Sequence, residues 1–536
     1  MNIGKKIAAL RAAAHLSQEG LAEALSVSRQ SISKWEMGEA MPQCEKIVQL
    51  AAFFHVSTDT LLCDESAAKS SSAAARKGQY FGTDGFRGEA GSTLTADHAY
   101  RVGRFLGWYY AKECRVLGKR ARIVIGKDTR RSSYMLEYAI AAGITASGAD
   151  AYMLHVTTTP SVSYVTRCDE FDCGIMITAS HNPFHDNGIK VITRHGEKAE
   201  DSLTAQIEAY LDGDLAAIGI SGTDLPHATG DNIGRIEDYA SGRNRYVGYL
   251  ISLASHSYKN LKIGLDCANG ASWMIAASVF NALGAKVQVI GNEPNGVNIN
   301  ESCGSTSMER LRRLVLSEHL DVGFAFDGDA DRCLAVDETG TIVDGDKILY
   351  VLAKRLQSRG MLQKDTVVAT VMSNSGLDKS LADLGISCEK TAVGDRFVFE
   401  RMQEGDFSLG GENSGHIILK KYATTGDGLL TAIMLTEELC DTKKSLSQLT
   451  APVKIFPQYM QNVRVRDKKA AIADPVVQAV AAEISATLQG AGRILLRASG
   501  TEPLLRVMVE CECEEKCRAL AARVVDTIVS RGHSQK

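Results

Sequence analysis

The segment Asp327-Gly-Asp-Ala-Asp-Arg332 places three carboxylates at alternate positions directly after an apolar run. In an extended segment, residues i, i+2 and i+4 project to the same side, so Asp327, Asp329 and Asp331 can direct three hard oxygens at one Mg²⁺. An acidic surface turn is the alternative. A calcium loop is disfavoured although Glu338 falls at its twelfth position, because Arg332 occupies the sixth, where a glycine is needed.

A second reactive segment is Thr178-Ala-Ser-His-Asn-Pro183, in which His181, Asn182 and a rigid Pro183 follow a serine at a strand-to-loop switch. Ser180 is therefore placed to present its hydroxyl outward, although a plain turn uses the same residue types. The sequence here has neither a Walker loop nor a Gly-x-Ser-x-Gly elbow, which disfavours triad hydrolysis. A phosphorylated Ser180 would supply a further oxygen to the cation held by the aspartates, because Mg²⁺ prefers phosphate ligation.

Phosphoryl transfer requires a protein mainly to position groups and neutralise charge, so cations should gather around the moving group. A phosphate that stays in place needs its own anchor, and Arg497-Ala-Ser-Gly-Thr501 with Arg506 offers backbone amides, hydroxyls and two guanidiniums. Substrate hydroxyls need fixed polar partners, which Glu412, Ser414 and His416 supply within one short loop. The candidate cations are Arg87, Lys127, Arg130, Lys190 and Arg332.

Parallel strands are expected to position these segments. After residue 79, β-branched runs repeatedly end in a Gly, Asp or Ser loop followed by an amphipathic helix, which predicts parallel α/β domains. Open parallel sheets bind ligands at the carboxyl ends of their strands. The last portion has two strands flanking a Ser-Gly-Thr loop and then an amphipathic helix, which predicts a small α+β domain. The predicted strands with their polar ends are 122–130, 174–180, 262–270, 322–327 and 367–374, with 493–497 and 505–509 in the last portion.

Composition limits the class of protein. A chain of 536 residues is too long for one core, because cores stop growing near about 250–300 residues. Its 45% hydrophobic and 23% charged residues are ordinary for a globular protein, and no apolar run approaches the ~20 residues of a membrane span. The 13 scattered cysteines and the absence of a secretion signal predict reduced thiols in the cytoplasm. A net charge of −4 means that any DNA binding must be local.

Taken together, these segments resemble the α-D-phosphohexomutases and, within that superfamily, the phosphoglucosamine mutase branch. The resemblance covers roughly Tyr80 to Ser530. It implies three related α/β domains and a smaller α+β domain that closes over a central cleft. The signatures, in family order, are YFGTDGFRG, TASHNPFHDNGIK, EPNGVNINESCGST, FDGDADR, AVGDRFV, GGENSGH, TTGDG and RASGTEPLLRVMVE.

The resemblance also implies a division of the chain. The stretch SAAKSSSAAARKG lacks any large apolar residue and is interpreted as a flexible linker, with an Ala-rich helical spacer as the alternative. The expected parts are a helix-turn-helix domain at 1–65, the linker at 66–78, a phosphoserine domain at 79–233, a metal-binding domain at 234–338, a sugar-binding domain at 339–450 and a phosphate-binding domain at 451–536.

By the same resemblance, each motif residue takes a role. Ser180 is similar to the phosphoserine that donates a phosphoryl group to the sugar and later reclaims one. Asp327, Asp329 and Asp331 are similar to the ligands that hold Mg²⁺ together with Ser180. The implied catalytic residues are Ser180, His181, Lys190, Arg87, Arg332 and His416, the sugar-hydroxyl ligands are Glu412 and Ser414, and the clamp on the non-reacting phosphate consists of Arg497, Ser499, Gly500, Thr501 and Arg506.

The implied reaction interconverts glucosamine 6-phosphate and glucosamine 1-phosphate through a sugar bisphosphate, on the way to amino-sugar nucleotides and cell-wall precursors. Gly500 and the Glu412-Asn413-Ser414 sequence resemble the glucosamine branch. Phosphomannomutase or phosphoglucomutase activity, on a hexose phosphate, is the alternative. A transcription regulator that only senses a sugar phosphate is a second alternative, but it predicts loss of the serine or the aspartates, and all of them are present.

Residues 1–65 resemble a Cro-like (XRE-type) helix-turn-helix domain. In that fold the second helix enters the major groove, so its side chains reach base edges while flanking residues hold phosphates. The segment has six Lys/Arg and eight Asp/Glu, and this net of −2 gives little nonspecific attraction to DNA. A dimerisation role and a retained fusion remnant therefore stay open as alternatives, as does a homodimer of the whole chain. The expected core is Leu21, Ala22, Leu25, Val27, Ile32 and Trp35, the base contacts are Gln30, Ser31, Ser33 and Lys34, and the phosphate contacts are Gln18 and Arg29.

Overall fold

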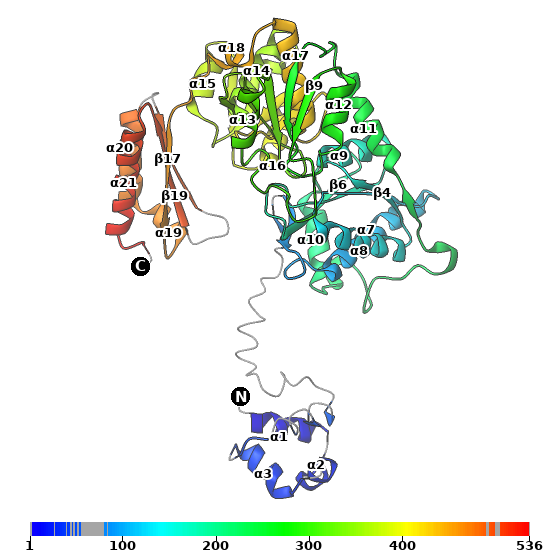
Figure 1. Cartoon of the computed structure of the whole chain (residues 1–536). Coiled ribbons are helices and arrows are strands. Elements are labelled where there is room, and N and C mark those ends of the chain that lie inside the picture. The colour runs from blue at the N-terminus through cyan, green and yellow to red at the C-terminus, as the bar shows by residue number, and fades with distance from the viewer. Residues whose placement is uncertain are drawn as a thin grey trace. The chain divides into compact units, whose positions relative to one another are not determined.

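The computed structural model divides the chain into two compact units, Met1–Gln79 and Tyr80–Lys536 (Figure 1). The linker predicted at 66–78 lies outside the described residues, and so do Ser499, Gly500 and Thr501. The structure describes residues 3–14, 16–25, 27–38, 40–42, 46, 49–50, 53–54, 80–82, 84–488, 492–498 and 504–534.

The first unit contains α1 (Ile3–Ala13), α2 (Gln18–Ala24) and α3 (Arg29–Met37). Serine caps begin two of these helices, because Ser17 accepts a hydrogen bond from the Gly20 amide and Ser28 accepts one from the Ser31 amide. Gly38, with φ 77°, ends α3 in the left-handed conformation that glycine adopts most easily. The predicted core is confirmed, with Val27 partly buried against a cluster of Ile7, Leu21, Ala22, Leu25, Ile32, Trp35 and Leu50.

The second unit begins with a seven-stranded sheet in the order β1-β2-β6-β5-β3-β4-β7. The predicted parallel arrangement holds for β3, β4, β5 and β7, whereas the pairs β5–β6, β6–β2 and β2–β1 are antiparallel. The chain between β5 and β6 is too short for a parallel crossover, which explains the difference. The strands are β1 (Phe81–Gly82), β2 (Gly85–Glu89), β3 (Arg122–Lys127), β4 (Asp150–Val156), β5 (Cys173–Ile177), β6 (Asp186–Thr193) and β7 (Ile236–Asp238), and the helices are α7 (Ala96–Val116), α8 (Arg131–Ala146), α9 (Thr159–Cys168) and α10 (Asp201–Leu211), with η1 (Ala216–Ile218) and η2 (Gly230–Asn232).

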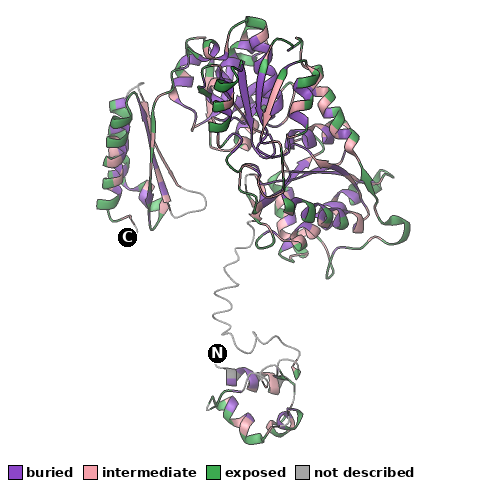
Figure 2. Ribbon diagram, viewed as in Figure 1, coloured by how far each residue is buried: buried purple, intermediate pink, exposed green. Residues whose placement is uncertain are grey.

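Two further sheets follow, in the orders β12-β11-β10-β8-β9 and β14-β13-β15-β16. One continuous apolar core runs through both, and Figure 2 shows buried residues concentrated in the strands and on the inner faces of the helices. The strands are β8 (Lys262–Asp266), β9 (Lys286–Ile290), β10 (Val322–Phe326), β11 (Cys333–Asp337), β12 (Ile342–Val343), β13 (Thr366–Thr370), β14 (Ser387–Thr391), β15 (Leu409–Gly411) and β16 (Ile417–Leu419). The helices are α11 (Ala240–Ser252), α12 (Ile275–Ala282), α13 (Glu309–Ser317), α14 (Gly345–Ser358), α15 (Ser375–Ala382), α16 (Asp395–Gly405), α17 (Gly428–Thr442) and α18 (Leu446–Thr450), with η3 (Gln363–Asp365).

The last portion is the predicted α+β arrangement. An antiparallel sheet in the order β17-β19-β18 is covered by helices, and α21 buries Cys517, Ala521, Val524 and Ile528 on one face, as its sequence pattern predicts. Each strand predicted in the earlier portion is also present, and each is followed by polar loop residues. The elements are β17 (Gln458–Arg464), α19 (Lys468–Ala473), α20 (Pro475–Leu488), β18 (Gly492–Ala498), β19 (Leu504–Cys511) and α21 (Glu514–Ser530).

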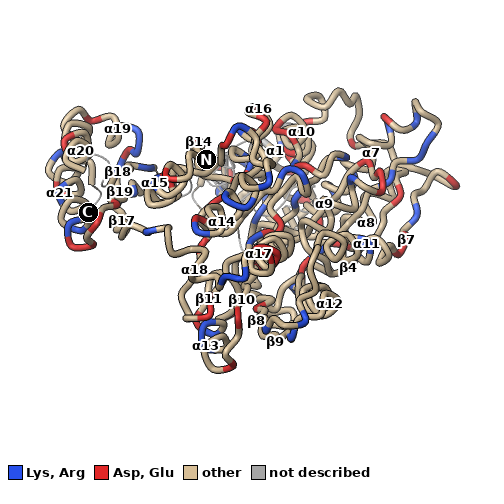
Figure 3. The backbone as a smooth tube through the Cα atoms, turned by 90° about the horizontal axis from the view of Figure 1, so that it is seen from above, with Lys and Arg blue, Asp and Glu red and all other residues tan. Residues whose placement is uncertain are grey.

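The surface carries both signs of charge. Basic and acidic residues are interspersed along the chain in Figure 3, which agrees with the small net charge. Among the described residues, no helix is both long and apolar enough to cross a membrane. The cysteines in the described part of the chain are free thiols.

Candidate active site

The three aspartates of the predicted cation site lie in the turn between β10 and β11. One carboxylate oxygen of each lies within 4.8 Å of the others. The expectation that an extended segment aligns them is wrong, because Ala330 has φ 55° and the chain reverses here to pair the antiparallel β10 and β11. The turn, rather than strand alternation, therefore brings the carboxylates together.

This aspartate cluster fits a divalent cation. Burial, together with the charges of Asp331 and Asp329, raises the pKa of Asp327 well above its usual range. The Oδ1 atoms of Asp329 and Asp331 are buried and have no hydrogen-bond partner. Converging buried carboxylates with unused oxygens are costly unless a cation compensates them. Glu338 instead accepts a hydrogen bond from the Ser447 amide at 3.3 Å, so it is directed away from any calcium loop.

Ser180 faces this cluster. Its Oγ donates to Oδ2 of Asp327 at 2.5 Å, and its backbone amide donates to Thr178 Oγ1 at 2.9 Å. A Cβ added at Gly328 would lie 2.4 Å from the Ser180 carbonyl oxygen, so a glycine between the aspartates lets the two loops approach each other. The serine loop and the acidic turn, which are far apart in sequence, thus meet at one point.

Two cations suggested by residue type do not face this point. Arg130 is fully buried, and its guanidinium donates to Asp128 Oδ2 at 2.9 Å and to the carbonyl of Ser180 at 2.9 Å. Lys127 is also buried and forms an ion pair with Glu137. Both cations have internal partners, so Arg130 holds the serine loop instead of meeting a phosphoryl group.

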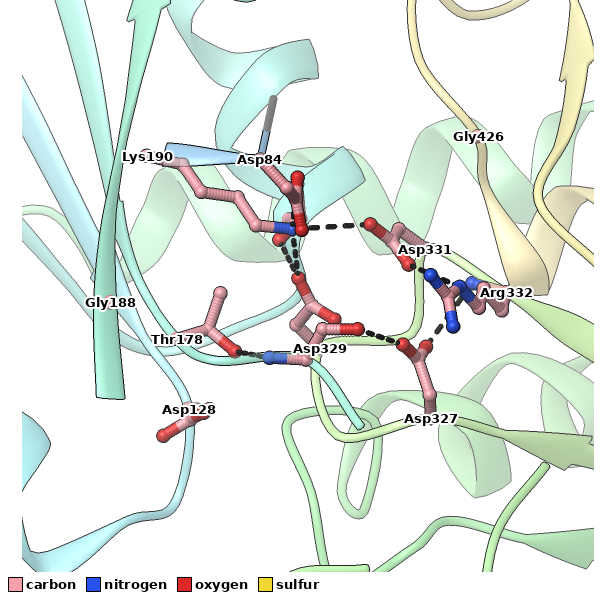
Figure 4. A network of polar contacts seen from close by, with 12 residues as sticks. Asp84, Asp128, Thr178, Gly188, Lys190, Asp327, Asp329, Asp331, Arg332 and Gly426 are labelled. Carbon is pink, nitrogen blue, oxygen red and sulfur yellow. Dashed lines mark hydrogen bonds and ion pairs between the residues drawn. The ribbon is translucent and has the colours of Figure 1, made fainter. Parts of the chain in front are cut away.

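Lys190 reaches the acidic turn from β6 (Figure 4). Its Nζ lies 2.9 Å from Asp329, 3.2 Å from Asp331 and 3.3 Å from Asp84. Burial alone would lower the pKa of Lys190, but the charges of Asp329, Asp84 and Asp331 raise it well above its usual value. The ammonium group therefore stays protonated beside the aspartates.

Three further predicted residues surround the serine. Arg332 Nη1 lies 3.0 Å from His181 Nδ1, and that ring nitrogen is 3.3 Å from Ser180 Oγ. Burial and the positive charges of Arg332 and Arg87 lower the pKa of His181 to about 4, so its ring is neutral near pH 7. Arg87 donates to Asn182 Oδ1 at 3.2 Å. The structure thus brings His181, Arg332 and Arg87 to the serine loop.

The predicted sugar-binding loop joins β15 to β16. His416 is buried, with Nδ1 3.7 Å from Asp331 and Nε2 3.5 Å from Asp395. Glu412 Oε1 accepts a hydrogen bond from the Gly394 amide at 3.2 Å, and Ser414 Oγ is buried without a partner. This loop therefore contacts the acidic turn through His416 and leaves one hydroxyl unused.

Sequence reasoning missed several polar residues of this site. Lys198 lies between Asp84 at 2.7 Å and Asp395 at 2.5 Å, and it lines two cavities of about 160 and 360 Å³. Thr159 donates its hydroxyl to Asp329 Oδ2. Asp84 and Asp395 lie within the quoted GTDGFRG and AVGDRFV signatures, so their motifs gave a signal. Lys198 and Thr159 lie outside every quoted signature.

The two arginines of the predicted phosphate clamp occupy paired positions on neighbouring strands. Arg497 of β18 and Arg506 of β19 are directly opposite each other. Among the described residues no carboxylate forms an ion pair with either, and Arg506 Nε is buried without a partner. Like charges that face each other across strands are destabilising without an anion.

In the first unit, the predicted DNA-contacting residues divide into two groups. Arg29, Gln30 and Lys34 of α3 are exposed, and Ser31 and Ser33 are partly buried on the same helix. Gln18 is instead engaged within the unit, because its Nε2 donates to Glu36 Oε2 at 2.7 Å.

Solved structures share this fold. One is a phosphoglucomutase/phosphomannomutase family protein from Burkholderia thailandensis, with a TM-score of 0.69 and 22% identity over 85% of this chain and 98% of the other. Another is Aspergillus fumigatus N-acetylphosphoglucosamine mutase in complex with GlcNAc-6P and magnesium, with a TM-score of 0.59 and 18% identity over 87% and 99% of the two chains. At these identities the likeness concerns the fold alone.

Family comparisons cover nearly the whole chain. The phosphoglucomutase/phosphomannomutase alpha/beta/alpha domains I, II and III match residues 78–216, 244–340 and 344–456, and the C-terminal domain of that family matches residues 460–527. A helix-turn-helix family matches residues 7–61. The chain is a phosphohexomutase by its fold and its family matches, with an added helix-turn-helix domain.

Curated relatives narrow the family. A phosphoglucosamine mutase of Lachnospira eligens is 56% identical over 85% of this chain and 100% of the relative. Those of Lachnoclostridium phytofermentans and Bacillus cytotoxicus are 55% and 45% identical, over 99% and 98% of their lengths. The chain therefore belongs to the phosphoglucosamine mutase family.

Proposed function

We propose that this protein interconverts glucosamine 6-phosphate and glucosamine 1-phosphate in the cytoplasm, for the synthesis of amino-sugar nucleotides and cell-wall precursors. The names of its relatives support this substrate. The observation that carries the mechanism is the 2.5 Å contact from Ser180 Oγ to Asp327, which sets one hydroxyl against three converging carboxylates. The cysteines in the described part of the chain are free thiols, which is typical of a protein in a reducing compartment.

Asp327, Asp329 and Asp331 would hold Mg²⁺ together with an oxygen of Ser180. When bound, the ion supplies positive charge that neutralises the phosphoryl group during transfer. Lys190 bridges two of the carboxylates through their Oδ2 atoms at 2.9 and 3.2 Å, which fixes their orientation. Thr159 holds Asp329 in the same way through its hydroxyl.

The phosphoryl group moves between Ser180 and the sugar. The bond from phosphorus to Ser180 Oγ breaks, a bond to a sugar hydroxyl oxygen forms, and the proton of that hydroxyl passes to a base. We assign this proton transfer to His416, whose imidazole ring contacts Asp331 and Asp395. The resulting glucosamine bisphosphate reorients, and its other phosphoryl group returns to Ser180, so phosphorus is conserved over the cycle. Arg87, Arg332 and His181 surround the serine and stabilise the transferred charge.

The remaining polar groups hold the substrate. Glu412 and Ser414 bind sugar hydroxyls, and the buried Ser414 Oγ has no hydrogen-bond partner within the protein. Arg497 and Arg506 clamp the phosphate that does not react, which relieves the repulsion between two facing guanidiniums. We include Ser499, Gly500 and Thr501 in this clamp because they connect the two arginine strands in sequence.

A direct comparison of kcat/KM on glucosamine, glucose and mannose phosphates tests the substrate assignment. We expect the glucosamine phosphates to be preferred by at least about 10-fold, which corresponds to about 1.4 kcal/mol. A preference for mannose or glucose phosphate would indicate the hexose alternative. Binding of a sugar phosphate without turnover of any of the three would instead indicate a sensing regulator.

We further propose that α3 of the first unit reads DNA, because it presents Arg29, Gln30 and Lys34 to solvent. A homodimer would place two such helices on half-sites roughly 34–36 Å apart. The test is a mobility shift of the full chain on DNA from its own promoter at several salt concentrations. We expect a salt-dependent shift that Gln30→Ala and Lys34→Ala remove and that Lys469→Ala, in the second unit, leaves unchanged. Absence of any shift at low salt would reject DNA binding.

A further inference from the structure

A third cavity, of about 510 Å³, shares no lining residue with the two cavities at Lys198. It lies where β3 and β4 end and where the β8–α12 and β9–α13 connections of the next sheet pass, so strand ends from two sheets border it. Strand carboxyl ends are the usual ligand sites of such sheets, and the volume is that of a small-molecule pocket. Its main lining side chains are Arg131, Tyr134, His155, Arg243, Trp273 and Asn295.

The lining of this cavity is cationic and contains no acidic residue. In the described parts of the chain no carboxylate forms an ion pair with Arg131 or Arg243, and Arg243 makes only a long contact of 3.4 Å to the Val156 carbonyl. His155 meets Asp238 at 3.3 Å, outside the lining. A cavity at Arg194, which lies at the opposite end of β3, differs, because Glu113 and Asp172 lie 3.5 Å from that arginine. Asp238 also attracts Arg243 electrostatically, but it forms no ion pair with that residue. Lysine, arginine and acidic residues are interspersed along the chain (Figure 3), so a cavity lined by two guanidiniums without an ion pair indicates an anionic ligand.

Flat and apolar side chains stand beside these arginines. Trp273 is partly buried against the core. Tyr134, in the first turn of α8, is 46% exposed, and Lys127 Nζ lies 4.1 Å from the centre of its ring, so the other face of the ring is left for a ligand. Met274, also in the lining, is 44% exposed. Aromatic faces next to guanidiniums suit a ligand with a planar ring and phosphate groups. A sugar phosphate alone fits less well, since the lining has no carboxylate to accept hydrogen bonds from sugar hydroxyls.

One wall of the cavity connects to the serine loop. Gly296 accepts a hydrogen bond from the Arg131 amide at 2.9 Å, and the same β9–α13 connection carries Asn300, whose Nδ2 donates to the Ser180 carbonyl at 2.9 Å. An occupant of the cavity would therefore touch a segment that also holds the reactive serine.

We propose that this cavity binds a nucleoside diphosphate, with its base against Trp273 and Tyr134 and its two phosphates on Arg131 and Arg243. This site is separate from the one proposed for glucosamine phosphate. The two arginines match the two phosphates in number, and the aromatic side chains match the base.

The test is calorimetric titration of the full chain with uridine diphosphate and adenosine diphosphate, each with and without saturating glucosamine 6-phosphate. We expect binding of at least one of them, at least about 10-fold weaker in Arg131→Ala, Arg243→Ala and Trp273→Leu, and unchanged in Arg313→Ala, which removes an exposed arginine of α13. Turnover of glucosamine phosphate by each variant checks that it is folded.

Four outcomes would overturn the proposal. The first is no binding of either nucleotide up to about 1 mM. The second is equal binding by all variants, and the third is loss of binding when glucosamine 6-phosphate is present, which would place the nucleotide in the Ser180 cleft. The fourth is pyrophosphate binding as tightly as the nucleoside diphosphate, which would reduce the cavity to a simple anion site.

Discussion

Asn300 and Ser180 are joined by a hydrogen bond of 2.9 Å from the asparagine Nδ2 to the serine carbonyl oxygen. Arg130 donates to the same oxygen at 2.9 Å. Ser180 has φ 52°, a left-handed conformation that costs a non-glycine residue of order 1–3 kcal/mol. Asn300 and Arg130, which lie in loops of two different sheets, therefore hold Ser180 in an unfavourable backbone conformation that directs its Oγ toward Asp327.

Asn300→Gly should lower kcat by about 10-fold with little change in KM, because a misplaced nucleophile affects the transfer step more than binding. Glycine keeps the left-handed backbone of Asn300, whose φ is 59°, and removes the side chain whose amide donates to the carbonyls of Ser180 and Asn182. The matched control is Ser302→Gly, an exposed left-handed residue of the same connection. A raised KM with unchanged kcat would show that Asn300 acts on substrate binding and not on the serine.

Thr159→Val should weaken the dependence on Mg²⁺, raising the concentration needed for half-maximal activity by about 10-fold. Valine keeps the shape of threonine but removes the hydroxyl that holds Asp329, and groups that orient metal ligands typically contribute about 10–100-fold to affinity. Thr157→Val is the control, because the Thr157 hydroxyl bonds Ser161 and no aspartate. Identical magnesium titrations for the two variants would rule out this role for Thr159.

Arg506→Ala and Arg497→Ala should each raise KM by about 10-fold or more and leave the melting temperature unchanged or slightly higher. Each change removes a phosphate donor and also relieves repulsion between two facing guanidiniums, which is worth about 0.2–1 kcal/mol. Arg464→Ala, on the exposed side of β17, is the control. A loss of stability without an effect on KM would mean that the arginines are structural.

Asp346 gives the second unit a predicted pH dependence of stability. Burial, with the charge of Asp344, raises the pKa of Asp346 to about 7, and one of its oxygens has no partner. The pKa of an aspartate in the unfolded chain is about 3.9, so between about pH 4 and 7 the folded state binds more protons than the unfolded state. The free energy of unfolding therefore falls as the pH rises through this range. The full cost of the ionised carboxylate, of order a few kcal/mol, is present above about pH 7.

Asp346→Asn should therefore melt at a higher temperature than the parent near pH 8, with the difference shrinking toward about pH 4. The amide oxygen can still accept the hydrogen bond that the Asn374 amide donates at 2.7 Å. Asp383→Asn, at an exposed aspartate, serves as the control in the same melting series. A variant that is less stable than the parent near pH 8 would contradict the assigned pKa.

Local patterns were sufficient to predict strands, helix faces and the acidic motif. Apolar runs ending in polar residues identify β3, β5, β8, β10 and β13, since their buried length and loop chemistry are both local. The helix face of α21 and the core of the first unit follow from periodicity in the same way. Long-range geometry was harder to predict.

The roles of individual cations show this limit. Arg130 and Lys190 are both basic residues near polar loops, yet only Lys190 faces the aspartates, and Arg130 is turned inward by Asp128. Thr159 binds Asp329 across 170 positions of sequence, and no spacing rule anticipates such a pair. The aspartates converge through a turn at Ala330 and not through the expected strand alternation.

The most direct test follows one phosphoryl group. Protein labelled with radioactive phosphate from glucosamine bisphosphate is mixed with glucosamine 6-phosphate and Mg²⁺ in a single turnover. Label should leave Ser180 and appear in the bisphosphate before it appears in glucosamine 1-phosphate, and Ser180→Ala should take up no label and show no turnover, whereas Ser317→Ala on α13 should behave as the parent. Label that stays on the protein through repeated turnovers, or undiminished turnover by Ser180→Ala, would contradict the account.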